Sequence, residues 1–178
     1  MISDFVKGKK RFDYPPGIQL GIQLHREIDE FTDTHEATRQ AKEIFRPHYR
    51  LYAGAFVDVV YDYFIANDKQ LFNESLLLEF TQHTYQLLEE KQSWFPEKFA
   101  RMFPYMKSQN WLFNYKDPWG IEKSFGGLVR RASYISESET AFRLFETHIV
   151  TFQQCYNLFE KDIKKFTATR FKALLETK

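Results

Sequence analysis

Residues 52–67 would be apolar on nearly every side of a helix, and this feature most narrows the folds open to the chain. The apolar residues of this segment are Phe56, Val57, Val59, Val60, Phe64 and Ile65. A helix without a polar face belongs at the centre of a domain, because other elements must cover each of its sides. The rest of the chain therefore has to surround this segment.

Apolar residues recur at helical intervals along most of the remaining sequence. The spacing predicts helices over residues 16–32, 36–45, 52–67, 74–92, 96–106, 117–132 and 138–175. Pro47 is expected to end or kink the second of them, and the last is long enough to bend. The two-residue alternation of a strand is not sustained anywhere. We therefore expect an all-α fold of about seven helices, formed as a single domain over residues 1–178.

Composition and charge restrict the kind of core, the partners and the compartment that we expect for this chain. Its 19 Phe, 10 Tyr and 3 Trp predict a core built on large rings. The net charge of +1 gives no overall attraction to nucleic acid, and no apolar run reaches the roughly 18–20 residues of a membrane span. The lone Cys155 excludes an internal disulfide. We expect a cytoplasmic protein that binds neither nucleic acid nor membrane; the sequence does not indicate an oligomeric state.

Acidic and imidazole side chains recur every four residues near the start of the chain. His25, Asp29 and Asp33 follow this spacing, so neighbouring pairs lie about 6 Å apart on one helical face. All three together span roughly 12 Å, which is too far for one ion. Two of them could share a metal, while the third supports them or holds a second ion. His35 lies just beyond the helix and could fold back toward the same site.

Asp58 and Asp62 repeat the four-residue spacing inside the apolar segment, where we expect them to be buried. A buried carboxylate costs several kcal/mol or shifts its pKa, so the pair needs a cation, an imidazole or a metal as partner. The alternative is a polar network in the core, in which either residue caps a helix or pairs with Arg26 or Arg39. Mixed imidazole and carboxylate ligands suit Mn, Fe, Mg or Zn.

Two basic groups are further candidates. The first is either a solvated loop or a patch that steers an acidic partner, and it comprises Lys7, Lys9, Lys10 and Arg11. Arg130 and Arg131, at the end of a predicted helix, could bind phosphate or simply interact favourably with the helix C-terminus.

Several strings of this sequence resemble the bacterial acyl carrier protein phosphodiesterases, also called holo-ACP hydrolases. They are DFVKG at 4–8, HREIDEFTD at 25–33, and Asp58 with YDYF at 61–64. Later landmarks are similar too: NWL at 110–112, Tyr115, Gly120 with Ile121, Leu128, and Arg130 with Arg131. The resemblance covers nearly the whole chain, and its most specific part is the string at 25–33.

The resemblance implies a fold distantly related to HD-domain phosphohydrolases and a divalent metal, manganese foremost, with iron or magnesium as alternatives. It implies hydrolysis of the phosphodiester that joins 4′-phosphopantetheine to a serine of acyl carrier protein, and so a link to fatty acid biosynthesis. By the same resemblance, the implied metal ligands are Asp4, His25, Asp29, Asp58 and Asp62. The residues implied in catalysis are His25, Asp29 and Asp62. The spacing adds Asp33 and His35 as residues that support these ligands. The acidic carrier protein would dock on the basic run from Lys7 to Arg11.

The sequence departs from the family pattern in two ways. Tyr63 stands where the family commonly has His, and the chain starts close to the Asp4 segment, where family members have an earlier His-containing helix. Either further chain lies upstream or the metal site is depleted. Two alternative functions therefore stay open. One is a catalytically weakened or silent relative that binds carrier protein, and the other is a phosphohydrolase of the same fold with another phosphoester substrate.

Overall fold

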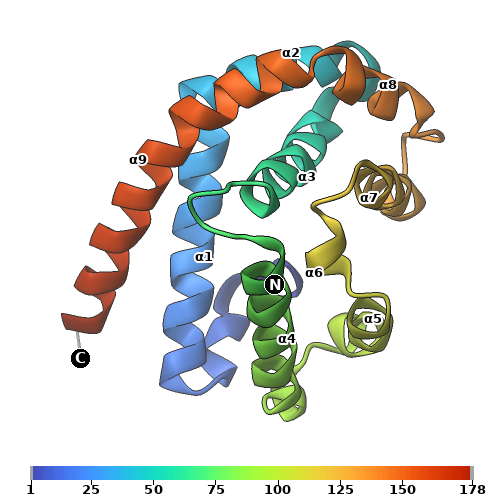
Figure 1. Ribbon diagram of the computed structural model, residues 1–178. Helices are drawn as coiled ribbons and strands as arrows, with labels where there is room; N and C mark the ends of the chain where they lie inside the picture. Colours follow the sequence, from blue (N-terminus) through green and yellow to red (C-terminus); the bar gives the residue numbers. More distant parts are fainter. Residues whose placement is uncertain (1, 177–178) are drawn as a thin grey trace.

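The computed structural model describes residues 2–176, and every regular element in that range is a helix, which confirms the all-α class. The α-helices are α1 Pro16–Thr34, α2 Glu36–Tyr49, α3 Ala53–Ala66, α4 Glu74–Glu89, α5 Glu97–Ser108, α6 Trp111–Asn114, α7 Pro118–Arg131, α8 Glu139–Thr147 and α9 Ile149–Glu176 (Figure 1). The short 3₁₀ helices are η1 Ser3–Phe5, η2 Gly8–Asp13, η3 Arg50–Tyr52 and η4 Gln92–Trp94. No described helix has the length and apolar character needed to cross a membrane.

Helix α3 lies inside the larger part of the molecule, as its apolar sequence predicts, and packs against α2, α7 and α9. Phenylalanine rings dominate the core around it. Phe45 of α2 stacks on Phe152 of α9 with ring centroids 5.2 Å apart, and Phe56 of α3 meets Phe125 of α7 edge-on at 5.0 Å. All four rings are buried. The expectation of a core built on large rings is therefore met.

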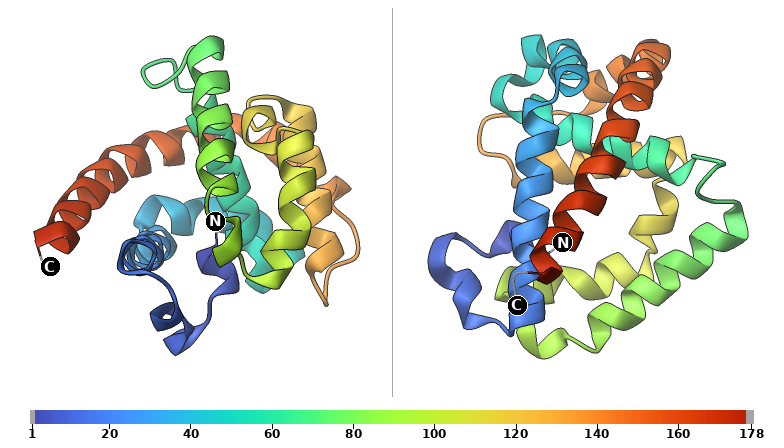
Figure 2. Two further views of the ribbon diagram at one scale, coloured as in Figure 1. Left: turned by 90° about the horizontal axis from the view of Figure 1, so that it is seen from below. Right: turned by 90° about the vertical axis from the view of Figure 1, so that its left-hand side faces the viewer.

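A second, smaller core forms where α4, α5 and α6 come together. Its buried members are Tyr85, Phe99, Phe103 and Met106. The N-terminal η1 reaches this core, because the ring of Phe5 lies 5.7 Å from that of Phe99. Since η1 also contacts α1, it connects the smaller core with the long helix α1, which runs beside α9 (Figures 1 and 2).

The helices differ from the sequence expectation at Pro47 and near the C-terminus, and the short helix α6 was not predicted. Pro47 does not end the second helix, because α2 continues to Tyr49. A proline inside a helix costs about 3 kcal/mol, but Phe45 and Tyr49 lie one turn apart and are both buried, and burial of a large side chain returns roughly 1.5–3 kcal/mol. Near the C-terminus, the single helix expected over 138–175 is two, α8 and α9, which meet at His148.

Candidate metal centre

Asp4, His25 and Asp29 converge on one point at the junction of η1 and α1. Nδ1 of His25 lies 2.9 Å from Oδ2 of Asp29, one helical turn further along α1. Nε2 of the same ring lies 4.0 Å from Oδ1 of Asp4. One ligand atom from each residue lies within 4.8 Å of the others, so the three side chains can reach a single ion. Asp4 and Asp29 are exposed and His25 is partly buried, which leaves the point open to a substrate.

The position of Asp4 is set by contacts of its neighbours in η1 and the turn that follows. The guanidinium of Arg26 donates a 2.6 Å hydrogen bond to the backbone carbonyl of Val6. The side chain of Val6 is buried, and Phe5 packs against the smaller core. These contacts hold a three-residue 3₁₀ helix against α1, and Asp4 projects from it beside His25.

Asp58 is exposed, so the expectation that it would be buried is wrong. It is nevertheless closely surrounded by protein, and partial desolvation raises the pKa of its carboxyl to about 7. After desolvation, the negative charge of Asp33 raises this pKa most, and the charges of Asp29 and Asp4 raise it further. The ammonium of Lys42 lowers it. Asp58 therefore lies within electrostatic range of the centre at His25.

Asp62 follows one turn later in α3 and is partly exposed. Desolvation, followed by the charge of Asp58, raises its pKa to about 7 as well. Within residues 2–176, neither carboxylate has an ion pair with a basic side chain, and Arg26 is bonded to Val6 instead. The alternative of an Asp–Arg network in the core is therefore not what the described residues form.

The hydroxyl of Tyr115 lies within electrostatic range of both Asp62 and Arg131. Desolvation, followed by the negative charge of Asp62, raises the pKa of Tyr115, while a hydrogen bond with Ser124 and the charge of Arg131 lower it. Arg131 also points an N–H toward Sδ of Met102 at 3.9 Å. Arg131 and the neighbouring Arg130 are both exposed in the last turn of α7.

Asp33 pairs with Lys42, a partner that the sequence analysis missed. The ammonium lies 2.7 Å from Oδ1 of Asp33 and also donates to its backbone carbonyl at 3.2 Å. A Cβ on Gly54 would lie 3.3 Å from Cε of Lys42, so the glycine lets the lysine pass close to α3. The one signal in the sequence was this glycine inside an otherwise apolar helix, four residues before Asp58.

His35 does not fold back toward His25. Its Nδ1 accepts a hydrogen bond from the backbone N–H of Ala37, so the imidazole caps the N-terminus of α2. Its Nε2 lies 3.2 Å from Oδ2 of Asp162 in α9. With both ring nitrogens engaged, His35 ties α2 to α9.

Tyr63 packs into the core. Its ring meets those of Phe64 and Phe145 edge-on, each at 5.3 Å. Tyr63, which the resemblance predicts to replace a histidine of the family, thus contributes to packing against α8.

The basic run comprises Lys7 and three residues of η2, directly after the segment that carries Asp4. Lys7, Lys9 and Lys10 are exposed and Arg11 is partly exposed, with its guanidinium 4.8 Å from the ring centroid of Phe12. Four cations next to the candidate centre give this edge of the molecule a local positive potential.

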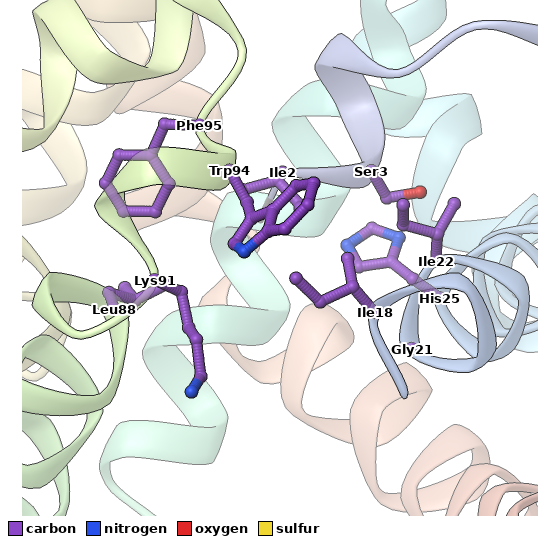
Figure 3. Close-up of a pocket in the computed structure, with 10 residues that line it drawn as sticks. All are labelled: Ile2, Ser3, Ile18, Gly21, Ile22, His25, Leu88, Lys91, Trp94 and Phe95. Atoms are coloured by element: carbon purple, nitrogen blue, oxygen red, sulfur yellow. The ribbon is translucent and has the colours of Figure 1, made fainter. Parts of the chain in front are cut away.

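A cleft of about 260 Å³ opens beside His25 (Figure 3). Side chains of α1 line one side of it, and side chains from the end of α4 and from η4 face them. Its walls are largely apolar and comprise Ile2, Ser3, Ile18, Gly21, Ile22, His25, Leu88, Lys91, Trp94 and Phe95. The cleft was not predicted from the sequence, because its two sides are more than sixty residues apart in the chain.

Comparison with known proteins assigns the chain to a family. A family profile described as acyl carrier protein phosphodiesterase matches residues 1–163, and the chain therefore belongs to that family. The family is one of hydrolases that act on phosphodiesters.

Individual relatives carry the same description. One from Photorhabdus laumondii subsp. laumondii is 31% identical over 157 residues, which cover 88% of this chain and 79% of the relative. One from Yersinia pestis is 30% identical over 149 residues, covering 83% and 77%. One from Escherichia coli O6:H1 is 32% identical over 132 residues, covering 74% and 68%. No solved structure matches the chain, so the distant relation to HD-domain phosphohydrolases stays a prediction.

Proposed function

We propose that this protein is a metal-dependent phosphodiesterase that hydrolyses the bond between 4′-phosphopantetheine and a serine of acyl carrier protein. The products are apo-carrier protein and free phosphopantetheine. The observation that carries the proposal is the convergence of Asp4, His25 and Asp29 on one point, in a chain of this family.

The donor set fits a divalent cation. One imidazole nitrogen and two carboxylate oxygens within 4.8 Å of one another suit Mn²⁺, Fe²⁺ or Mg²⁺, the ions that the resemblance implies. A cation bound by these residues would polarise the phosphoryl group and neutralise its charge. We propose Asp58 and Asp62 as further ligands or as neighbours of the bound ion.

The carboxyls of α3 supply the acid–base chemistry. In the metal-free protein, desolvation raises the pKa of both Asp58 and Asp62 to about 7. A divalent cation bound beside them would lower it and favour the ionised form, which is the form that a general base requires. In the proposed reaction, the member of this pair that does not bind the ion accepts the proton of the water that attacks phosphorus. The bond from phosphorus to the serine oxygen breaks, and the proton passes to that oxygen. Asp29 orients the imidazole of His25 through their 2.9 Å contact.

Two groups of basic residues have proposed roles in binding the substrate. We propose that Arg130 and Arg131 neutralise a phosphate oxygen; in support, the charge of Arg131 reaches the Tyr115 hydroxyl, which Asp62 also influences. Acyl carrier proteins are acidic, and the four cations on η2 and just before it, in the segment that follows Asp4, offer them a complementary surface. These cations are Lys7, Lys9, Lys10 and Arg11.

Mass spectrometry of holo-acyl carrier protein incubated with the enzyme and Mn²⁺ tests the proposal. We expect loss of the phosphopantetheine mass, and loss of this activity in Asp29→Ala. Glu30→Ala is the matched control, because Glu30 is the adjacent exposed acid on α1. A wild-type protein that binds no divalent ion and releases no phosphopantetheine would overturn the proposal, and binding of carrier protein without turnover would identify a silent relative instead.

A further inference from the structure

The residues that line the cleft beside His25 are not those of a binding site for a charged ligand. Apart from His25 at one end and Lys91 at the other, its walls are mostly hydrocarbon and aromatic (Figure 3). Such a lining favours an uncharged ligand, or part of one, because an apolar wall cannot replace the water around a charge. The cleft therefore suits a part of the substrate that carries no phosphate.

Its size restricts the occupant further. Pockets for whole small molecules measure roughly 300–1,000 Å³, so about 260 Å³ is room for one slender arm. A phosphodiester between phosphopantetheine and serine has two substituents on phosphorus. One is a folded protein, which cannot enter such a cleft, and the other is the pantetheine arm, whose first carbons beyond the phosphate carry two methyl groups.

The position of the cleft matches this choice. It begins at His25, one of the three residues that converge on the candidate ion, so a group bound there is attached directly to the reacting phosphate. The basic η2 follows η1 in the chain and does not line the cleft, and the proposed docking of the carrier protein lies on it. The two substituents of phosphorus are thereby directed to different surfaces.

We infer that the cleft between α1 and the α4–η4 segment binds the pantetheine arm of the prosthetic group, with the dimethyl end beside His25 and the thiol end toward Lys91. This inference rests on the proposed function and adds a substrate-binding site to it. Ile18, Ile22 and Trp94 supply the apolar contacts along the arm.

Gly21 gives a clean way to test the site. It lines the cleft, and a Cβ added there would meet no atom within 4 Å. Leucine at this position would fill the cleft from the α1 side without displacing a neighbour of the Cβ. Leucine is also a better helix former than glycine by up to about 1 kcal/mol, so the variant is expected to fold. Gly17, one turn earlier on α1, has equally open surroundings and does not line the cleft, which makes Gly17→Leu the matched control.

The first measurement is calorimetric binding of pantetheine, which lacks the phosphate and so reports on the cleft apart from the ion. We expect Gly21→Leu to weaken binding by about tenfold or more, and Gly17→Leu to bind as the wild type does. Mn²⁺ affinity of Gly21→Leu, measured in parallel, should be unchanged. Failure of pantetheine to bind the wild type, or equal binding by Gly21→Leu, would overturn the inference.

The second measurement is hydrolysis of holo-carrier protein. We expect a KM for Gly21→Leu about tenfold above that of the wild type and of Gly17→Leu. Unchanged turnover and KM in Gly21→Leu would overturn the inference and leave the proposed function intact. Absence of hydrolysis by the wild type, together with weakened pantetheine binding in Gly21→Leu, would refute the phosphodiesterase proposal and support the binding site.

Discussion

The guanidinium of Arg26 in α1 donates a 2.6 Å hydrogen bond to the backbone carbonyl of Val6, twenty residues earlier in the chain. This bond fixes the end of η1, and with it the one candidate ligand, Asp4, that does not come from α1 or α3. The candidate centre thus depends on a residue that would not touch the ion.

Replacement of Arg26 by methionine keeps most of the packing and removes the bond to Val6. Hydrogen bonds from charged groups contribute about 1.5–3 kcal/mol, so we expect η1 to loosen and Mn²⁺ affinity to fall by about tenfold. Calorimetric titration measures the change. In an Asp4→Ala background the same replacement should have little further effect on affinity. An equal drop in both backgrounds would mean that Arg26 does not act through Asp4.

The basic run on η2 is expected to affect encounter with the carrier protein and not the chemical step. Lys9→Glu combined with Lys10→Glu should raise KM for holo-carrier protein by about tenfold with little change in kcat, because charge complementarity mainly governs association. Steady-state kinetics at low and high salt check this, since the difference from the wild type should shrink as salt screens the charges. Lys98→Glu with Lys172→Glu, both exposed and on other helices, is the control. A fall in kcat alone would count against docking at η2.

The stability of the metal-free protein should decrease as pH rises through neutrality. Asp58 and Asp62 ionise near 3.8 in the unfolded chain but have a pKa of about 7 in the folded one. The folded state therefore holds more protons between these values, and the stability that is present below pH 3.8 is lost as pH rises through about 7. Thermal unfolding in a chelator at pH 5 and pH 8 tests this against Asp62→Asn, whose melting temperature should fall less over the same interval. Parallel pH profiles for the two proteins would contradict the raised pKa of Asp62.

Among the seven glycines, Gly120 is the position where an added methyl group should destabilise the fold most. A Cβ there would lie 2.0 Å from the backbone oxygen of Asn114, so α7 and α6 would have to separate. Overpacking of this kind typically costs about 1–3 kcal/mol, and we expect Gly120→Ala to lose at least that much by denaturant unfolding. Gly127→Ala in the same helix meets only Arg130 at an ordinary 3.7 Å and should be neutral or slightly stabilising. Equal stability of the two variants would show that α6 moves aside easily.

Periodicity was enough to predict the class of the fold and most of its helices, because each apolar face repeats over several turns. It was also enough to pair His25 with Asp29, since residues four apart on a helix are neighbours whatever the tertiary structure. Asp4 entered the candidate set only through the family resemblance, because its approach to His25 depends on packing of η1 that no local pattern encodes.

The failures have a common physical origin in tertiary contacts. Asp58 was expected to be buried because its neighbours in sequence are apolar, yet α3 leaves this one side uncovered. His35 was expected near His25, but the free N–H groups at the start of α2 and the carboxylate of Asp162 engage it instead. Lys42 was overlooked because only the folded chain brings it to Asp33.

The attachment of η1 to the smaller core has a consequence for how the protein responds to heat. Phe5 packs on Phe99. If α4–α6 unfold locally on heating, Asp4 would lose its position and the proposed ion binding would weaken, while the larger phenylalanine core remains folded. The working temperature of such an enzyme would then be set by its smaller core. Substitutions around Phe99, remote from the reacting phosphate, would be a route by which a lineage adapts the enzyme to a colder or warmer habitat.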